Sequence, residues 1–130
     1  MATLTIQDRT ATGTPTGSID LPNVPDRVTL RDLIRLRVRE EVARYNLAPG
    51  MNFAGFVQPD GATPGSHGYV MPAPRRIEWE RQADIAIDSF LRNGFFVMVN
   101  GRQETDLAHE IALGSDLDVA FIKLTPLVGG

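Results

Sequence analysis

The sequence predicts a single α+β domain in which a mixed β-sheet wraps around an amphipathic helix. Strand-like alternation occurs near both ends of the chain, a helical pattern follows the first strands, and a second helical pattern precedes the last strands. If the first and last strands share a sheet, the helix between them must cross one sheet face. The 130 residues are enough to bury a core without disulfides.

Composition excludes several classes of protein. Apolar residues make up 42% and charged residues 22% of the chain, and no apolar run approaches the roughly 20 residues of a transmembrane helix. A net charge of −3 without long blocks of one sign disfavours nucleic acid as a partner. The chain has no cysteine, and its N-terminus lacks a secretion-signal pattern. We therefore expect a cytoplasmic protein that neither enters a membrane nor binds nucleic acid.

The first element is predicted to be a β-hairpin. Leu4 and Ile6 alternate with polar residues, Ile19 and Leu21 repeat that pattern, and turn-forming residues fill the segment between them. Residues 28–46 then change to helical spacing. Thr29 is placed to cap this helix, and its apolar stripe consists of Leu30, Leu33, Ile34, Val38, Val42 and Tyr45.

Residues 47–76 are predicted to be an irregular insert within the single domain, 1–130. This segment holds five of the nine prolines and five of the twelve glycines. It therefore cannot form a single regular helix or strand. Apolar residues are expected to pin it to the body through short extended pieces, and these are Phe53, Phe56, Val57, Tyr69 and Val70.

Helical spacing returns at Ile77. The expected core stripe consists of Trp79, Ala83, Ala86, Ile87, Phe90 and Leu91, and Gly94 fits the left-handed position that ends a helix. The acidic residues of this helix are expected on a solvated face, and they are Glu78, Glu80, Asp84 and Asp88.

The final third predicts two strands joined by a hairpin, then a turn and a last strand. Residues 95–99 form an apolar run that indicates a central strand, and Asn100-Gly101 is a strong signal for a tight turn. Residues 105–114 are expected to form a turn or a single helical turn. The last strand then places Val119 and Phe121 on one face. This order of elements is that of the β-grasp fold.

Residues 97–130 resemble the closing segment of the sulfur-carrier and ubiquitin-like β-grasp proteins, above all the small subunit of molybdopterin synthase. The matching residues, in order, are Val99, Asn100, Gly101, Leu113, Gly114, Asp118, Val119, Ala120, Phe121, Val128, Gly129 and Gly130. Three features depart from that family, and one of them is that this chain is longer than its members. Its usual proline pair before the tail is replaced by Lys-Leu-Thr-Pro-Leu, and the insert has no counterpart there.

The resemblance implies a protein substrate and carrier, not an enzyme. Gly129 and Gly130 would form the thin end of a flexible tail, 127–130, that enters the ATP site of an E1-like activating enzyme. Leu127 and Val128 would serve in tail recognition. ATP would be used by that partner, and no cofactor would be bound by this chain.

Two fates of the activated carboxylate remain open, and a third reading needs no activation. The tail is conjugated to target proteins with an E2-like partner and a deconjugating protease, or it receives sulfur from a sulfur-transfer partner and becomes a thiocarboxylate. Alternatively, the chain is a protein-binding β-grasp module with an inert tail. Twelve arginines against the single Lys123 favour a bacterial-type modifier that forms few chains, although a GC-rich genome predicts the same ratio.

Other chemistry finds little support. His67 and His109 have no second histidine or cysteine at metal-ligand spacing, so no metal site is predicted. Ser66 and Ser115 have no base at recognisable spacing, which disfavours a hydrolase.

Overall fold

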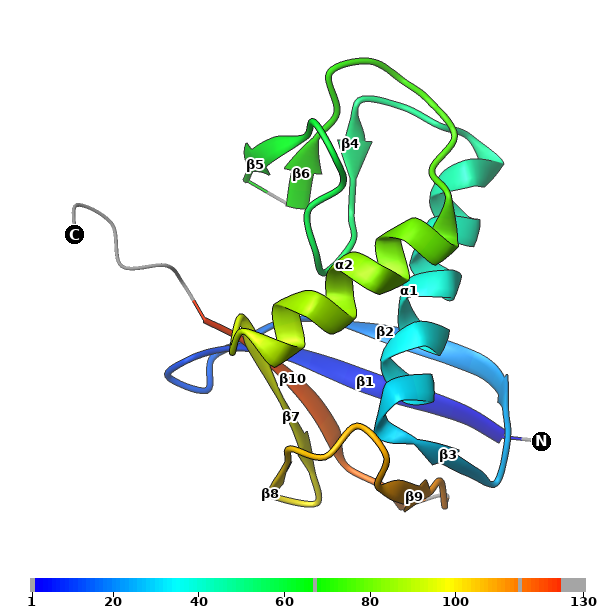
Figure 1. Cartoon of the computed structure of the whole chain (residues 1–130), viewed down its shortest axis with the longest axis vertical. Coiled ribbons are helices and arrows are strands. Elements are labelled where there is room, and N and C mark those ends of the chain that lie inside the picture. Colours follow the sequence, from blue (N-terminus) through cyan, green and yellow to red (C-terminus); the bar gives the residue numbers. More distant parts are fainter. Residues whose placement is uncertain (1, 67, 115, 125–130) are drawn as a thin grey trace. The chain divides into compact units, whose positions relative to one another are not determined.

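The computed structural model describes residues 2–66, 68–114 and 116–124. The fold is α+β, with two helices and a sheet of parallel and antiparallel strands (Figure 1). The chain divides into two compact units. The described parts of Met1–Leu33 and Phe90–Gly130 form the first, and those of Ile34–Ser89 form the second. The predicted insert, 47–76, falls within the second unit.

The predicted N-terminal hairpin is confirmed in the first unit. β1 (Ala2–Thr10) and β2 (Pro15–Val24) pair in antiparallel fashion, with Ile6 opposite Ile19. Side chains two residues apart along a strand share one face of the pleat, and here that face is buried. It consists of Leu4, Ile6, Ile19 and Leu21.

The first hairpin shares a sheet with the last strand, as predicted. β1 pairs in parallel with β10 (Val119–Lys123), which aligns Ile6 with Val119, and Figure 1 shows these two strands side by side. On its other side β10 pairs in antiparallel fashion with β7 (Phe95–Val99), which in turn pairs with β8 (Arg102–Glu104). The strand order is β2-β1-β10-β7-β8, so β10 occupies the centre of the sheet.

The predicted Asn100-Gly101 turn joins β7 to β8. Both residues have positive φ, 51° and 77°, as a tight hairpin turn of this kind requires. Asn100 Oδ1 accepts a hydrogen bond from Asp118 N at 2.9 Å, and Asn100 N donates to Asp118 O at 2.7 Å. These bonds tie the turn to the residue before β10.

Two short strands were absent from the sequence analysis. β3 (Arg27–Thr29) and β9 (Glu110–Ala112) pair in antiparallel fashion, with Val28 opposite Ile111. The turn expected within 105–114 is present, since His109 N donates to Asp106 O at 3.0 Å, but the strand that follows it was not predicted. A three-residue strand is too short to show alternation, and this pair is stabilised by burial of the two facing apolar side chains.

The first predicted helix is α1 (Leu30–Leu47), and its cap is confirmed. Asp32 N donates to Thr29 Oγ1 at 3.1 Å, which satisfies one of the backbone donors that a helix start leaves free. Leu30 N donates to His109 O at 2.9 Å. The segment that carries β9 therefore contributes to capping this helix.

The second predicted helix is α2 (Trp79–Leu91), with two corrections at its end. Leu91, expected in the core, is 64% exposed. Asn93, with φ of 60°, adopts the left-handed conformation that we assigned to Gly94. Asparagine tolerates this region because its short polar side chain bonds locally. The acidic residues expected on a solvated face are exposed, and they are Glu78, Glu80, Asp84 and Asp88.

The insert contains the expected short extended pieces. β4 (Asn52–Phe53), β5 (Thr63–Gly65) and β6 (Gly68–Val70) form a three-stranded sheet in the order β4-β6-β5. The Phe53 ring packs edge-on against Tyr45 of α1, with centroids 5.4 Å apart.

Four of the five apolar residues expected to pin the insert are buried: Phe53, Phe56, Val57 and Tyr69. Val70 is the exception, at 36% exposed. It alternates with the buried Tyr69 along β6, so the two side chains point to opposite faces of the strand.

Candidate functional site

The four residues assigned to the tail lie outside the described residues: Leu127, Val128, Gly129 and Gly130. The structure describes the chain as far as Leu124, just after β10. The candidate site is therefore the end of the sheet from which the C-terminal segment continues.

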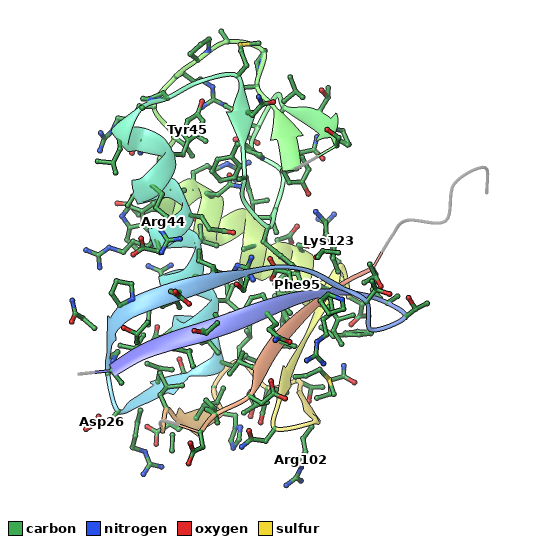
Figure 2. The ribbon with its side chains drawn as sticks, turned by 180° about the vertical axis from the view of Figure 1, so that it is seen from behind. Asp26, Arg44, Tyr45, Phe95, Arg102 and Lys123 are labelled. Atoms are coloured by element: carbon green, nitrogen blue, oxygen red, sulfur yellow. The ribbon has the colours of Figure 1, made fainter. Side chains whose placement is uncertain are left out.

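The end of β10 is fixed on both sides. Lys123, the last residue of the strand, is aligned with Thr10 of β1 and with Phe95 of β7. Figure 2 labels Lys123 and Phe95 at this end of the sheet. Beyond the strand, Leu124 N donates to Gly94 O at 3.3 Å. A strand bonded to two neighbours holds this point in place relative to the sheet.

Aromatic side chains pack beneath the same end of the sheet. The rings of Phe95 and Phe121 stack with centroids 5.5 Å apart and an interplanar angle of 15°. Phe90 meets Phe95 at 5.6 Å in an edge-on arrangement. Each such pair contributes about 0.5–1.5 kcal/mol beyond its buried area. All three rings are buried, so the base of the C-terminal segment is well packed.

The opposite face of the same strands carries apolar side chains that are partly exposed. Burial alternates along β7, so Phe96 and Met98 are half-buried between fully buried neighbours. The apolar run had suggested burial on both faces. The register places Phe96 opposite Ile122 and Met98 opposite Ala120. We call these four residues the outer apolar patch; apart from the buried Ala120, they are partly accessible to a partner.

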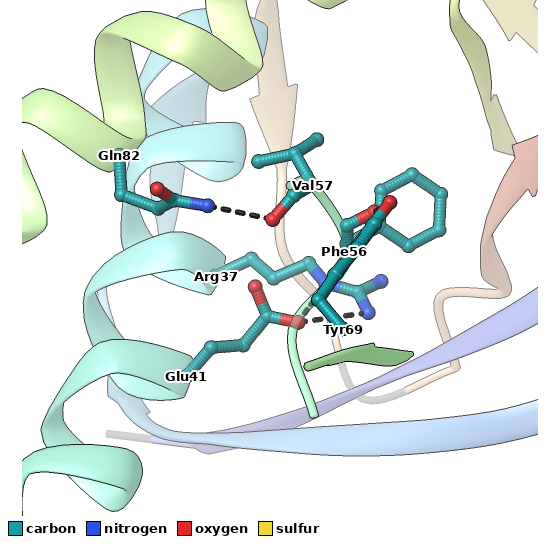
Figure 3. A network of polar contacts seen from close by, with 6 residues as sticks. All are labelled: Arg37, Glu41, Phe56, Val57, Tyr69 and Gln82. Carbon is teal, nitrogen blue, oxygen red and sulfur yellow. Dashed lines mark hydrogen bonds and ion pairs between the residues drawn. The ribbon is translucent and has the colours of Figure 1, made fainter. Parts of the chain in front are cut away.

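The second unit holds a buried polar network that the sequence analysis missed (Figure 3). The side chains of Arg37 and Glu41 in α1 are only 3% and 4% exposed, and Arg37 Nη2 donates to Glu41 Oε2 at 3.2 Å. The Arg37 guanidinium also lies 4.5 Å from the centroid of the Phe56 ring. Gln82 Nε2 of α2 donates to Val57 O at 2.6 Å.

This network stabilises the insert. Backbone carbonyls in the irregular segment need hydrogen-bond donors when they are buried. Gln82 supplies one to Val57, and Tyr69 Oη donates to Phe56 O at 3.5 Å. The arrangement accounts for buried polar side chains on the helices beside the insert, namely Arg37 of α1, which lies over Phe56, and Gln82 of α2, which binds Val57. The six residues that Figure 3 draws include no histidine, serine or cysteine.

The four-residue spacing of Arg37 and Glu41 in the sequence could have indicated that the two side chains form an ion pair. Arg37 and Glu41 continue the row that begins at Leu33, on the edge of the apolar stripe of α1. A side chain on that edge is buried whenever another segment covers it. Here that segment is the insert, whose path the sequence does not reveal.

One exposed carboxylate has a perturbed pKa. Arg81 donates from Nε to Asp60 Oδ2 at 3.0 Å, and this hydrogen bond is the main cause that lowers the pKa of Asp60 below its ordinary value. The same contact raises the pKa of Arg81. Both side chains are exposed, so the pair joins the loop before β5 to α2 with little net gain in stability.

Of the two histidines, His109 belongs to the described residues and His67 lies outside them. His109 Nδ1 lies 2.7 Å from Glu104 Oε2. In the part of the chain that the structure describes, no three histidine, aspartate or glutamate side chains gather as metal ligands would.

Comparison with known proteins gives no relative for this chain. No family model, no curated protein and no solved structure matches it. Neither α1 nor α2, the helices among the described residues, has the length and apolar character to span a membrane.

Proposed function

We propose that this protein is a ubiquitin-like β-grasp protein whose Gly130 carboxylate is adenylated by an E1-like enzyme and then conjugated to target proteins. One observation carries the proposal: β10 lies at the centre of the sheet, parallel to β1, and is bonded on both sides up to Lys123. The segment that follows it therefore starts from a rigid base. The β-grasp assignment fits the shared sheet of the first hairpin and the last strand.

Adenylation requires a C-terminal segment narrow enough to enter the nucleotide site of the activating enzyme. In adenylation a Gly130 carboxylate oxygen attacks the α-phosphorus of ATP, forms an acyl-adenylate and expels pyrophosphate. Glycine at 129 and 130 has no Cβ to narrow the backbone shapes or to clash in a tight nucleotide site. Leu127 and Val128 come just before the diglycine and supply side chains for recognition.

A relay through a thioester needs a thiol from the partner, because this chain contains no cysteine. The activated carboxyl carbon is then attacked by a cysteine of the activating enzyme, with AMP as the leaving group. A target amine next displaces that thiol. The only lysine of the chain is Lys123, so chain formation between copies has few acceptors.

A second candidate is a sulfur carrier, and it is favoured by the resemblance of residues 97–130 to the small subunit of molybdopterin synthase. In this case hydrosulfide from the sulfur-transfer partner attacks the carbonyl carbon of the adenylate, AMP leaves, and one carboxylate oxygen is thereby replaced by sulfur. The fold requirements are the same for both fates. Only the product at Gly130 separates them.

Intact-mass spectrometry tests both fates. The protein is incubated with ATP and E1-like enzymes from its own genome, with and without a sulfur donor. The expected products are an adenylate and an enzyme thioester, and an oxygen-to-sulfur exchange at Gly130 would instead select the carrier. A variant lacking Gly129 and Gly130 should give none of these, whereas Gly17→Ala, at an open position on β2, should react normally.

Loss of cellular function on deletion of the diglycine is also expected. If the truncated chain supports the cellular role as well as the full chain does, the tail is inert. The proposal would then fail, and the protein-binding module would be correct.

A further inference from the structure

Trp79 is not the core residue that its place in the apolar stripe predicted. It is half-buried at the start of α2, and two arginines of α1 lie over its ring. The guanidinium carbon of Arg35 is 5.1 Å from the ring centroid, and that of Arg39 is 5.6 Å away. All three residues belong to the second unit. We call them the Arg-Trp cluster.

Among the described residues, no carboxylate pairs with either of these two arginines. Arg37 and Arg44 on the same helix pair with Glu41 and Glu40. Among the residues that the structure describes, Arg35 and Arg39 form no ion pair, and their charged groups contact the indole ring instead. Like charges one helical turn apart repel each other, so a bound anion would reduce the repulsion between Arg35 and Arg39.

The ring holds the two guanidinium groups in place. Cation–π attraction to tryptophan is worth about 0.5–1 kcal/mol at exposed sites. It restricts the long arginine side chains before any ligand arrives, which lowers the entropy lost on binding. Two planar donor groups fixed on one surface suit carboxylates, which guanidinium groups bind in a bidentate manner.

We propose that the Arg-Trp cluster binds an acidic segment of a partner protein through its side-chain carboxylates. A nucleobase is a poorer ligand, because guanidinium groups already lie over the indole where a base would stack. The acidic segment is expected to be short, because exposed Glu78 and Glu80 flank Trp79 and repel carboxylates beyond those that the two arginines bind.

Trp79 is the only tryptophan of the chain, so its fluorescence reports on this cluster alone. Titration of the full-length protein with a blocked hexaglutamate peptide at low ionic strength should change that fluorescence to saturation. A hexaglutamine peptide of the same length should leave it unchanged. Added salt should weaken the response, because the contact is between charges.

Matched variants separate binding at the cluster from general charge attraction. Arg39→Gln should weaken hexaglutamate binding by about tenfold, the effect of one charge-assisted contact. Arg102→Gln removes the same charge from exposed β8 in the first unit and should have little effect. The double variant Arg35→Gln/Arg39→Gln should abolish the response, while circular dichroism verifies that it remains folded.

Several outcomes would overturn the inference. These are no response to hexaglutamate, equal responses to the two peptides, or equal losses in Arg39→Gln and Arg102→Gln. Tighter binding of a single-stranded oligonucleotide of equal charge would exclude an acidic peptide as the ligand class. The variant lacking Gly129 and Gly130 should bind hexaglutamate normally, so this result does not depend on the proposed activation of the tail.

Discussion

Arg37 and Glu41 lie one helical turn apart on α1 and form an ion pair in which neither side chain is more than 4% exposed. Both Nε and Nη2 of Arg37 donate to Glu41 Oε2, at 3.3 and 3.2 Å. Removing two charges from water is costly, and their attraction repays this only when the geometry and further contacts are good. The Phe56 ring at 4.5 Å from the guanidinium is one such contact.

Glu41→Gln should destabilise the protein by about 3–5 kcal/mol, because it removes the carboxylate charge that pairs with the buried Arg37 guanidinium. Urea unfolding followed by Trp79 fluorescence measures this, since the tryptophan lies in the same unit. The double variant Arg37→Met/Glu41→Leu removes both charges and should be markedly more stable than Glu41→Gln. If Glu41→Gln unfolds at the wild-type urea concentration, the pair is not buried as described.

Gly68→Ala should disrupt the small sheet of the second unit. Gly68 has a φ of 114°, and a Cβ at this position would lie 2.5 Å from Phe53 O. The backbone conformation alone costs about 1–2 kcal/mol for an alanine, and the clash with a carbonyl adds to it. Gly17→Ala is the matched control, because its Cβ meets nothing within 4 Å and its φ is not positive. The midpoint temperature of thermal unfolding should fall clearly for Gly68→Ala and stay near the wild-type value for Gly17→Ala.

Titration of Asp60 should reveal its contact with Arg81. NMR should give Asp60 a pKa below the ordinary 3.8, and Arg81→Gln should return it toward that value. A lowered pKa in the folded state stabilises the protein above the ordinary pKa, and that contribution is lost as pH falls through the folded-state value. The stability difference between wild type and Arg81→Gln should therefore vanish in acid. An unchanged Asp60 titration in the variant would contradict the contact.

Much of the first unit could be predicted because its signals are local. Alternation places Ile6 and Ile19 on one buried face, and the Asn100-Gly101 turn follows from the positive φ that both residues accept. The parallel pairing of β1 with β10 is not local. Connection rules require a helix to cross the sheet if the first and last strands share it, whereas the direction and register of this pair come from the structure.

The remaining features depend on tertiary contacts. β3 and β9 are too short to show a period, and Arg37 reads as a solvated residue until the insert covers it. Trp79 was predicted to be a core residue because it falls on the apolar stripe of its helix, but arginines from another helix lie over its ring. For the candidate site, the diglycine is visible in the sequence. The pairing of the preceding strand, β10, with both of its neighbours could be described only from the structure.

The outer apolar patch should serve as the docking face for the activating enzyme, which is a prediction that rests on the proposed function. Ile122 lies on β10 one residue before its end, is half-buried, and faces Phe96 across the strand pair. Ile122→Ser removes an apolar contact worth about 1–2 kcal/mol at a well-packed interface, so kcat/KM for pyrophosphate release should fall about tenfold. Gln103→Ala, on the exposed strand β8, is the control and should react at the wild-type rate. If Ile122→Ser is fully active while removal of Gly129 and Gly130 abolishes activity, the tail is activated but the enzyme docks on another surface.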